Sequence, residues 1–128
     1  MSSSVRHVVP ILNVRDVATT LAFYVDVLGF DSSWSWDDPP TFGGVVTGHA
    51  EIQFCQDGQG GPGTWVSVWV DDVDALYERL RSRDVDIRQP PTSFEWGVRE
   101  LNVADPDGHR IRFSTRTLEV SDRTDLVT

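Results

Sequence analysis

The chain has 128 residues, a length that suits one compact domain or two small modules sharing a core. Its net charge of −9 excludes the basic footprint of a nucleic-acid-binding protein; it fits plain solubility or a cationic ligand. No apolar run approaches the ~20 residues of a membrane span, no signal-peptide pattern follows Met1, and a single cysteine excludes an internal disulfide. We therefore expect a cytoplasmic protein with no membrane or nucleic-acid partner.

The first half of the chain predicts a strand, a helix and then further strands. Asp16 is placed to cap the helix, and Gly29 is placed to end it. Between them an apolar stripe with helical spacing consists of Val17, Leu21, Tyr24 and Leu28. Runs of β-forming or alternating residues predict the strands, at 5–14, 31–36, 42–46 and 51–55.

The second half repeats this order after a glycine-rich linker at 58–63. A strand at 65–70 leads through an acidic cap into a helix that ends near Asp84, and the apolar stripe of this helix is Val73, Leu76, Tyr77 and Leu80. Strands at 96–103 and 110–114 flank Asp-Pro-Asp-Gly, a strong turn sequence. The coarse order is thus β-α-β-β-β, used twice, which points to two half-barrels around a ligand cleft.

Two pairs of motifs are the most distinctive in the chain: residues 13–17 with Phe-Tyr-Val-Asp-Val-Leu-Gly-Phe at 23–30, and Trp-Gly-Val-Arg-Glu at 96–100 with Asp-Pro-Asp-Gly at 105–108. In these motifs the chain resembles the vicinal-oxygen-chelate superfamily, which holds glyoxalase I, extradiol dioxygenases and bleomycin-resistance proteins. The runs at 66–70 and 96–100 are most similar to the bleomycin-resistance branch.

The resemblance covers about residues 7–115 and implies an α+β fold, in which two tandem βαβββ modules form a half-open barrel cleft. We expect a single domain at 5–115, with module one at about 5–57, the linker at 58–63 and module two at about 64–115. A polar C-terminal tail at 116–128 completes the chain. The resemblance also implies a homodimer.

Side chains alternate between the two faces of a strand, so apolar positions mark the core face and their neighbours face the cleft. The expected core positions are Ile52, Phe54, Val66, Val68, Val70, Leu101, Val103, Ile111 and Phe113. The expected ligand-binding residues of the cleft and its rim are Trp34, Trp36, Phe42, Glu51, Gln53, Trp65, Ser67, Trp69, Trp96, Glu100 and Arg112. This aromatic wall with a few charges suits a flat, partly cationic molecule. The alternative is that the tryptophans pack the core and a dimer interface.

Enzymes of the resembled superfamily hold a metal at four inward-facing positions. By motif these positions fall on Val9, Gln53, Trp65 and Arg112, of which only Gln53 offers a ligand atom. The resemblance therefore implies no metal and no cofactor here. The alternative is a shifted site built from His7, His49, Glu51 and Glu100.

Three further expectations concern single groups. Glu100 and Arg112 are predicted to stand opposite each other in the last hairpin, as an ion pair that either orients a polar ligand or is structural. His109 is expected on the surface beside the turn. Cys55 has no histidine placed beside it and is expected to be inert packing.

These observations favour a non-catalytic binding protein of the bleomycin-resistance type that sequesters an aromatic antibiotic or metabolite, in particular a cationic one. The first alternative is an enzyme of the same fold, either a metal-dependent glyoxalase-like lyase, isomerase or dioxygenase, or one that uses Glu100 as an acid–base group. A pathway-specific carrier is a further alternative.

Overall fold

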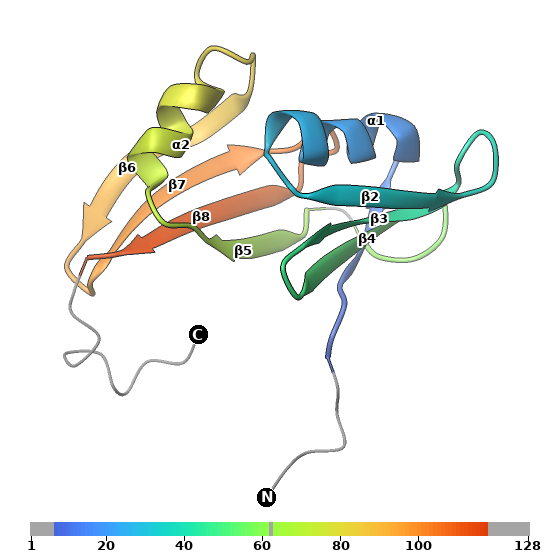
Figure 1. Ribbon diagram of the computed structural model, residues 1–128, viewed down its shortest axis with the longest axis horizontal. Coiled ribbons are helices and arrows are strands. Elements are labelled where there is room, and N and C mark those ends of the chain that lie inside the picture. Colours follow the sequence, from blue (N-terminus) through green and yellow to red (C-terminus); the bar gives the residue numbers. More distant parts are fainter. Residues whose placement is uncertain (1–6, 62, 118–128) are drawn as a thin grey trace, which may run out of the picture. The chain divides into compact units, whose positions relative to one another are not determined.

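The computed structural model describes residues 7–61 and 63–117, and the chain divides into two compact units, Met1–Thr64 and Trp65–Thr128. Each unit holds one four-stranded sheet and a helical segment (Figure 1). The predicted strand residues 5–6 and all but the first two residues of the predicted tail lie outside the described residues. In the described ranges, no helix is long and apolar enough to cross a membrane.

The first unit contains a mixed sheet in the order β1-β4-β3-β2, in which only the β1–β4 pair is parallel. A short α-helix continues directly into a π-helical turn between β1 and β2. The elements are β1 (Ile11–Val14), α1 (Val17–Ala22), η1 (Phe23–Val27), β2 (Ser32–Trp36), β3 (Phe42–Thr47) and β4 (Ala50–Gln56).

The second unit repeats this arrangement with the strand order β5-β8-β7-β6 and a single parallel pair, β5–β8. Its elements are β5 (Trp65–Trp69), α2 (Val73–Leu80), β6 (Asp86–Phe94), β7 (Val98–Ala104) and β8 (Arg110–Arg116). The equal order of strands and helices in the two units confirms the predicted tandem βαβββ fold.

Both predicted acidic caps are confirmed. The Asp16 carboxylate accepts hydrogen bonds from the backbone N–H groups of the first turn of α1, the closer at 3.1 Å. Asp72 does the same for α2, with distances of 3.0 and 3.2 Å. Gly29, with φ of 91°, follows Leu28 and ends the first helical segment as predicted.

Several predicted bounds are wrong. Helix α2 ends at Leu80 rather than near Asp84, which lies in the following turn with a left-handed φ of 57°. Strand β1 begins only at Ile11. The repeated βαβββ order implied a strand between the second helix and residue 96, but no residue range was predicted for it. This strand is β6, which contains Pro90 and Pro91 and tolerates them as an edge strand with register shifts.

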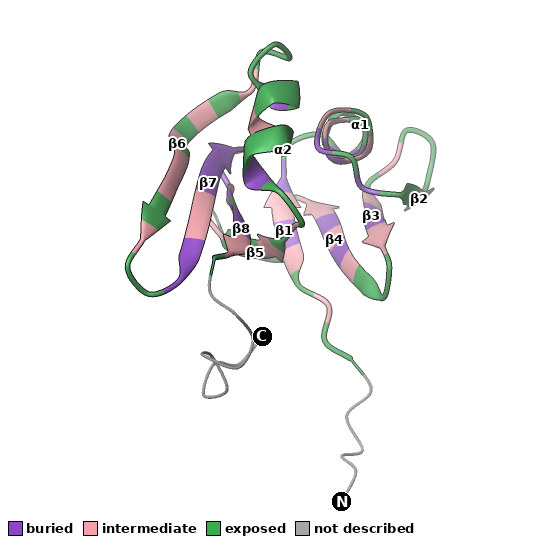
Figure 2. Ribbon diagram, turned by 60° about the vertical axis from the view of Figure 1, so that its left-hand side comes forward, coloured by how far each residue is buried: buried purple, intermediate pink, exposed green. Residues whose placement is uncertain are grey.

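In each unit the helical segment buries one face of the sheet. In the first unit Tyr24 packs against Phe54 with ring centroids 4.8 Å apart. Buried positions alternate with more exposed ones along β4, as the period of two predicts (Figure 2). Along β8 the alternation holds from Arg110 to Phe113, after which Ser114 is buried as well. The predicted core residues of β4, β7 and β8 are all buried: Ile52, Phe54, Leu101, Val103, Ile111 and Phe113.

The predicted core positions of the fifth strand, Val66, Val68 and Val70, are only half-buried. Strand β5 lies at the edge of its sheet, so it has a neighbouring strand on one side only.

Gly43 provides a test of the packing between α1 and β3. An added Cβ would lie 2.7 Å from the backbone oxygen of Trp34 and 3.1 Å from Cδ1 of Leu21. We expect Gly43→Ala to destabilise the protein by about 1–3 kcal/mol, because the backbone of β2 has to move. Gly61→Ala, where a Cβ meets nothing within 4 Å, is the matched control. Urea unfolding measures both, and equal stabilities would contradict this packing.

The ion pair between Asp74 of α2 and Arg99 of β7, at 2.8 Å, gives a pH-dependent prediction. Hydrogen bonding from Arg99 lowers the pKa of the Asp74 carboxyl below its usual value. The pair therefore stabilises the fold above the ordinary carboxyl pKa, and this contribution is lost as the pH falls through the lowered value. Asp74→Asn should have a lower Tm than wild type at neutral pH, and the difference between the two Tm values should disappear in acid. A Tm difference independent of pH would contradict the assignment.

Candidate functional site

In the first unit, five of the predicted site residues gather on the sheet face opposite the helix. We call this surface the Glu51 face; it consists of Trp34, Trp36, Phe42, Glu51 and Gln53. The two tryptophans share a face of β2, and Trp36 stands directly opposite Phe42 of β3. The three ring centroids lie 5.9–6.2 Å apart, and the Trp36 side chain is largely exposed.

Glu51 is the acidic centre of this face. Its Oε2 atom accepts hydrogen bonds from the Trp34 indole Nε1 at 2.9 Å and from the Gln53 amide at 3.1 Å. Among the described residues, no donor bonds to Oε1. The carboxylate is therefore fixed beside the Trp34 indole, which belongs to the three-ring cluster, and its other oxygen is left for a ligand.

Gly44 makes room for this arrangement. It pairs with Trp34 on one side and Gln53 on the other. An added Cβ would lie 2.9 Å from the Trp34 indole and 3.0 Å from the Glu51 carboxylate. Glycine thus lets the indole lie close over β3 and reach Glu51.

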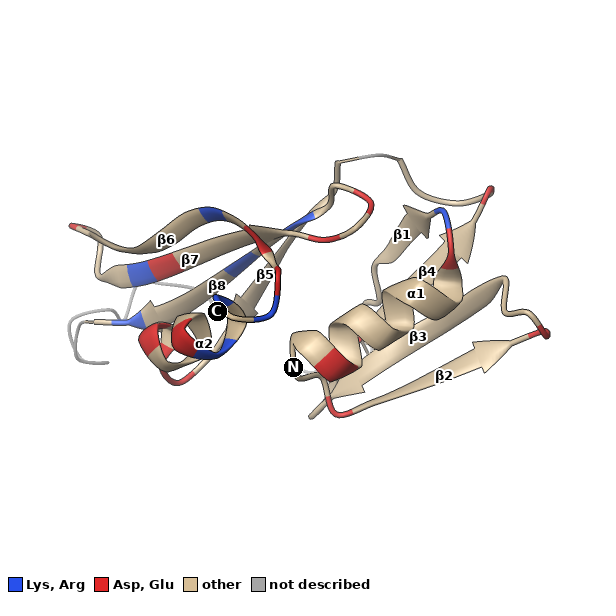
Figure 3. Ribbon diagram, turned by 90° about the horizontal axis from the view of Figure 1, so that it is seen from above, with Lys and Arg blue, Asp and Glu red and all other residues tan. Residues whose placement is uncertain are grey.

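In the second unit, the helix-free face brings arginines against tryptophans. We call this surface the Arg112 face; it consists of Trp65, Ser67 and Trp69 of β5 with Arg110, Arg112 and Arg116 of β8. These arginines share one face of β8, which is marked by blue segments in Figure 3.

Each β5 side chain of this face holds one guanidinium. That of Arg110 lies 5.4 Å from the ring centroid of Trp65, and that of Arg116 lies 4.4 Å from the ring centroid of Trp69. Cation–π contacts of this kind orient both groups. Arg116 was missed because the sequence assigned it to the tail, although the period of two along β8 places it on the face of Arg110.

The predicted opposition of Glu100 and Arg112 is wrong. Arg112 stands opposite Asn102, and Glu100 stands opposite Ser114. Arg112 instead donates from Nε and Nη2 to the Ser67 hydroxyl, at 3.2 and 2.7 Å.

The cause of this error is the turn between β7 and β8. Opposition of Glu100 and Arg112 requires a loop at 104–108, whereas the structure pairs Ala104 with Arg110, which leaves the loop at 105–109. Asp105 donates its backbone N–H to the His109 carbonyl, while its side chain accepts from the backbone N–H of His109 at 2.9 Å. His109 is thereby drawn into the turn, and it is fully buried rather than on the surface as predicted.

Trp96 lies in the turn between β6 and β7 rather than in a strand. It stacks on Phe94 with centroids 4.6 Å apart and an interplanar angle of 15°, and it is 57% exposed. Glu100 remains on the helix-free side of β7, half-buried. Neither residue forms a hydrogen bond or an ion pair with Arg112 in the described part of the chain.

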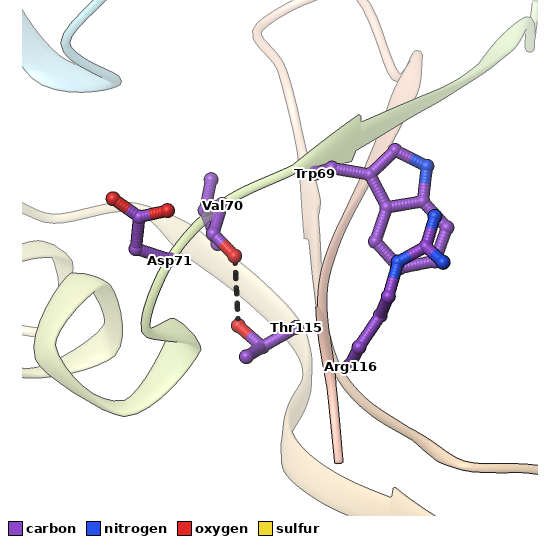
Figure 4. A pocket seen from close by; sticks show the side chains of 5 residues that line it. All are labelled: Trp69, Val70, Asp71, Thr115 and Arg116. Atoms are coloured by element: carbon purple, nitrogen blue, oxygen red, sulfur yellow. Dashed lines mark hydrogen bonds between the residues drawn. The ribbon is translucent and has the colours of Figure 1, made fainter. Parts of the chain in front are cut away.

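An open pocket of about 350 Å³ lies at the end of β5, and it is lined by Trp69, Val70, Asp71, Thr115 and Arg116 (Figure 4). The Thr115 hydroxyl donates to the Val70 carbonyl at 3.1 Å and fixes this part of the wall. The Trp69 indole and the Arg116 guanidinium form the other wall, and the Asp71 carboxylate points away from them.

The residues at the superfamily's metal positions do not fit a metal. Val9 and Trp65 have no ligand atom for a hard cation, the Arg112 guanidinium repels one, and Gln53 is engaged with Glu51. Among residues 7–61 and 63–117, no three histidine, cysteine, aspartate or glutamate side chains form a metal-binding group, so the alternative set around His49 is not assembled. Cys55 is half-buried and has no histidine in contact within these ranges.

The Trp34–Glu51 hydrogen bond can be tested in solution. Gly44→Ala should push the indole away from the carboxylate and shift the Trp34 indole N–H resonance in a ¹H–¹⁵N spectrum. Glu51→Gln should shift the same resonance, while the resonance of Trp96 stays in place in both variants. An unchanged Trp34 signal in Gly44→Ala would contradict the geometry of the Glu51 face.

Comparison with known protein families matches residues 4–113 to the Glyoxalase/Bleomycin resistance protein/Dioxygenase superfamily. A search of curated proteins gave no match. Among solved structures, TioX from Micromonospora sp. ML1 is 28% identical with a TM-score of 0.76, covering 88% of this chain and 99% of TioX.

Two other solved structures are similar over nearly their whole length. A superfamily member from Sphaerobacter thermophilus DSM 20745 is 29% identical with a TM-score of 0.70, covering 88% of this chain and 98% of its own. TnmS3, an antibiotic binding protein from Streptomyces sp. CB03234, has a TM-score of 0.75 and covers 90% of this chain and 99% of its own; its identity of 24% shows the fold alone. By the extent of the family match, the chain belongs to the Glyoxalase/Bleomycin resistance protein/Dioxygenase superfamily.

Proposed function

We propose that this protein is a non-catalytic binding protein of the bleomycin-resistance type, which sequesters a planar aromatic antibiotic or metabolite, in particular a cationic one. The observation that carries the proposal is the Glu51 face, where three neighbouring aromatic rings lie together and one of them, the Trp34 indole, donates to a carboxylate. The other oxygen of that carboxylate accepts no hydrogen bond from the described residues. The proposal includes the homodimer and the cytoplasmic location expected from the sequence.

The physical argument begins with Trp36, which is 67% exposed although it belongs to a ring cluster. A planar ligand that stacks on such a ring removes apolar surface from water and gains about 0.5–1.5 kcal/mol beyond that area. A positive charge on the ligand gains further from the ring faces and from the Glu51 carboxylate.

The side chains at the superfamily's metal positions also support binding over metal-dependent catalysis. The superfamily's metal positions are occupied here by side chains that do not suit a divalent cation. TnmS3, which shares the fold, is an antibiotic binding protein. Because that likeness shows the fold alone, the proposal for this chain depends on its own aromatic residues.

The experiment is calorimetric titration with a bleomycin-type glycopeptide and with proflavine, a planar aromatic cation. We expect wild type to bind one of them, and Trp36→Ala to weaken that binding about tenfold or more, as loss of an aromatic anchor does. Thermal melts serve as a control, because an exposed Trp36 should be dispensable for folding. Failure of wild type to bind either probe at high micromolar concentration would contradict the proposal.

The charge of Glu51 gives a separate prediction. Glu51→Gln should weaken proflavine binding several-fold at low salt, and the difference should shrink as salt screens the carboxylate. Glu78→Gln on α2 makes the same change in net charge away from the face and is the matched control. If both variants weaken binding equally, Glu51 has no specific role and only the net charge acts.

A further inference from the structure

The Arg112 face carries the opposite charge to the Glu51 face. Three guanidiniums point from β8 to the same side of the sheet, whereas the acidic residue of the adjoining strand β7 on that side is Glu100. Within the described residues, neither Arg110 nor Arg112 forms an ion pair with a carboxylate. The arginines attract an anion at contact distance. The net charge of −9 repels the same anion over longer distances, at which salt screens the repulsion.

Arg112 is oriented for a ligand rather than bound to a protein acid. Two of its five N–H donors, on Nε and Nη2, point to the Ser67 hydroxyl, and the others remain without a partner among the described residues. A guanidinium held by its neighbours loses little entropy when a carboxylate binds. The flanking Trp65 is 55% exposed and Trp69 is 45% exposed, and both offer ring surface beside it.

Asn102 adds an unsatisfied acceptor at the same place. It stands directly opposite Arg112 on the helix-free side of β7 and is 7% exposed. Its Oδ1 atom is buried and accepts no hydrogen bond from the residues that the structure describes. A buried acceptor without a donor destabilises the protein, so a ligand donor that bonds to it gains affinity. Because Oδ1 is covered, this bond forms only after the side chains above it part.

We infer that the Arg112 face recognises an aromatic acid that carries a hydrogen-bond donor on its ring. The acid group accepts from the Arg112 guanidinium, the donor bonds to Asn102 Oδ1, and the ring stacks on Trp65 or Trp69. The Arg112 guanidinium is bonded to Ser67 of β5, whereas Asn102 lies in β7 on the other side of β8, so the acid and the donor must occupy separate ring positions rather than ortho positions. This inference rests on the proposed function in that the ligand is a sequestered aromatic compound, but it does not rest on a positive charge, because the Arg112 face suits an acid whereas the Glu51 face suits a cation.

The test is calorimetric titration of the full chain with a naphthoate that bears a hydroxyl group meta to its carboxylate. Two matched probes each remove one feature: the corresponding naphthol lacks the acid, and the corresponding methyl ether lacks the donor. We expect the hydroxynaphthoate to bind about tenfold more tightly than either, the loss expected for one charged or buried hydrogen bond. Arg112→Gln should abolish the preference for the acid, and Ser67→Ala should reduce it. Arg81→Gln on α2, with the same change in charge, should retain it.

Equal binding of the naphthol and the acid would overturn the inference, as would equal losses in Arg112→Gln and Arg81→Gln. Equal binding of the methyl ether would overturn the role of Asn102. Parallel titration with proflavine separates this inference from the proposed function. Proflavine binding without any preference for the acid leaves aromatic sequestration standing and removes the Arg112 assignment, whereas no binding of any probe removes both.

Discussion

The structure depends on one packing constraint: each four-stranded sheet has a helix on one face only. The helical segment of each unit buries alternate residues of the strands beneath it, such as Phe54 and Phe113. Because side chains alternate along a strand, the intervening residues all point to the other face. That face need not be apolar, so it can hold tryptophan, glutamate and arginine side chains together.

The two units use this common frame for different chemistry. In the first, Gly44 leaves room for the Trp34 indole to lie over the sheet and donate to Glu51. In the second, the same sheet order places the arginines of β8 beside the tryptophans of β5, and Ser67 orients Arg112. One face thus offers an acceptor among aromatic rings and the other offers donors among aromatic rings. A duplicated fold has acquired two surfaces of opposite charge.

Sequence reasoning predicted what depends on local chemistry and periodicity. The caps at Asp16 and Asp72 and the stop at Gly29 follow from backbone hydrogen bonding and glycine conformation. The period of two separated core from helix-free positions along β4, β7 and β8. The grouping of Trp34, Trp36 and Phe42 with Glu51 could likewise be reached from strand parity.

The errors concern features that depend on contacts along and between strands. The pairing of Arg112 with Asn102 is set by how the Asp105 turn closes, and several closures suit Asp-Pro-Asp-Gly equally well. The bounds of strand β6 were not predicted, because it contains two prolines that only an edge strand tolerates. The burial of His109 follows from the same turn. The hydrogen bond from Arg112 to Ser67 joins two strands that are distant in sequence, so no local sequence pattern predicts it.

The central claim is that the helix-free sheet faces, and not the helices, bind an aromatic ligand. A ¹H–¹⁵N titration of the full chain with proflavine tests it most directly, because every backbone amide reports separately. The account predicts the largest shift changes in β2, β3 and β4 around Trp34, Trp36 and Glu51, with little change in α1 and α2. Changes concentrated on the helices, with the strands unaffected, would contradict it.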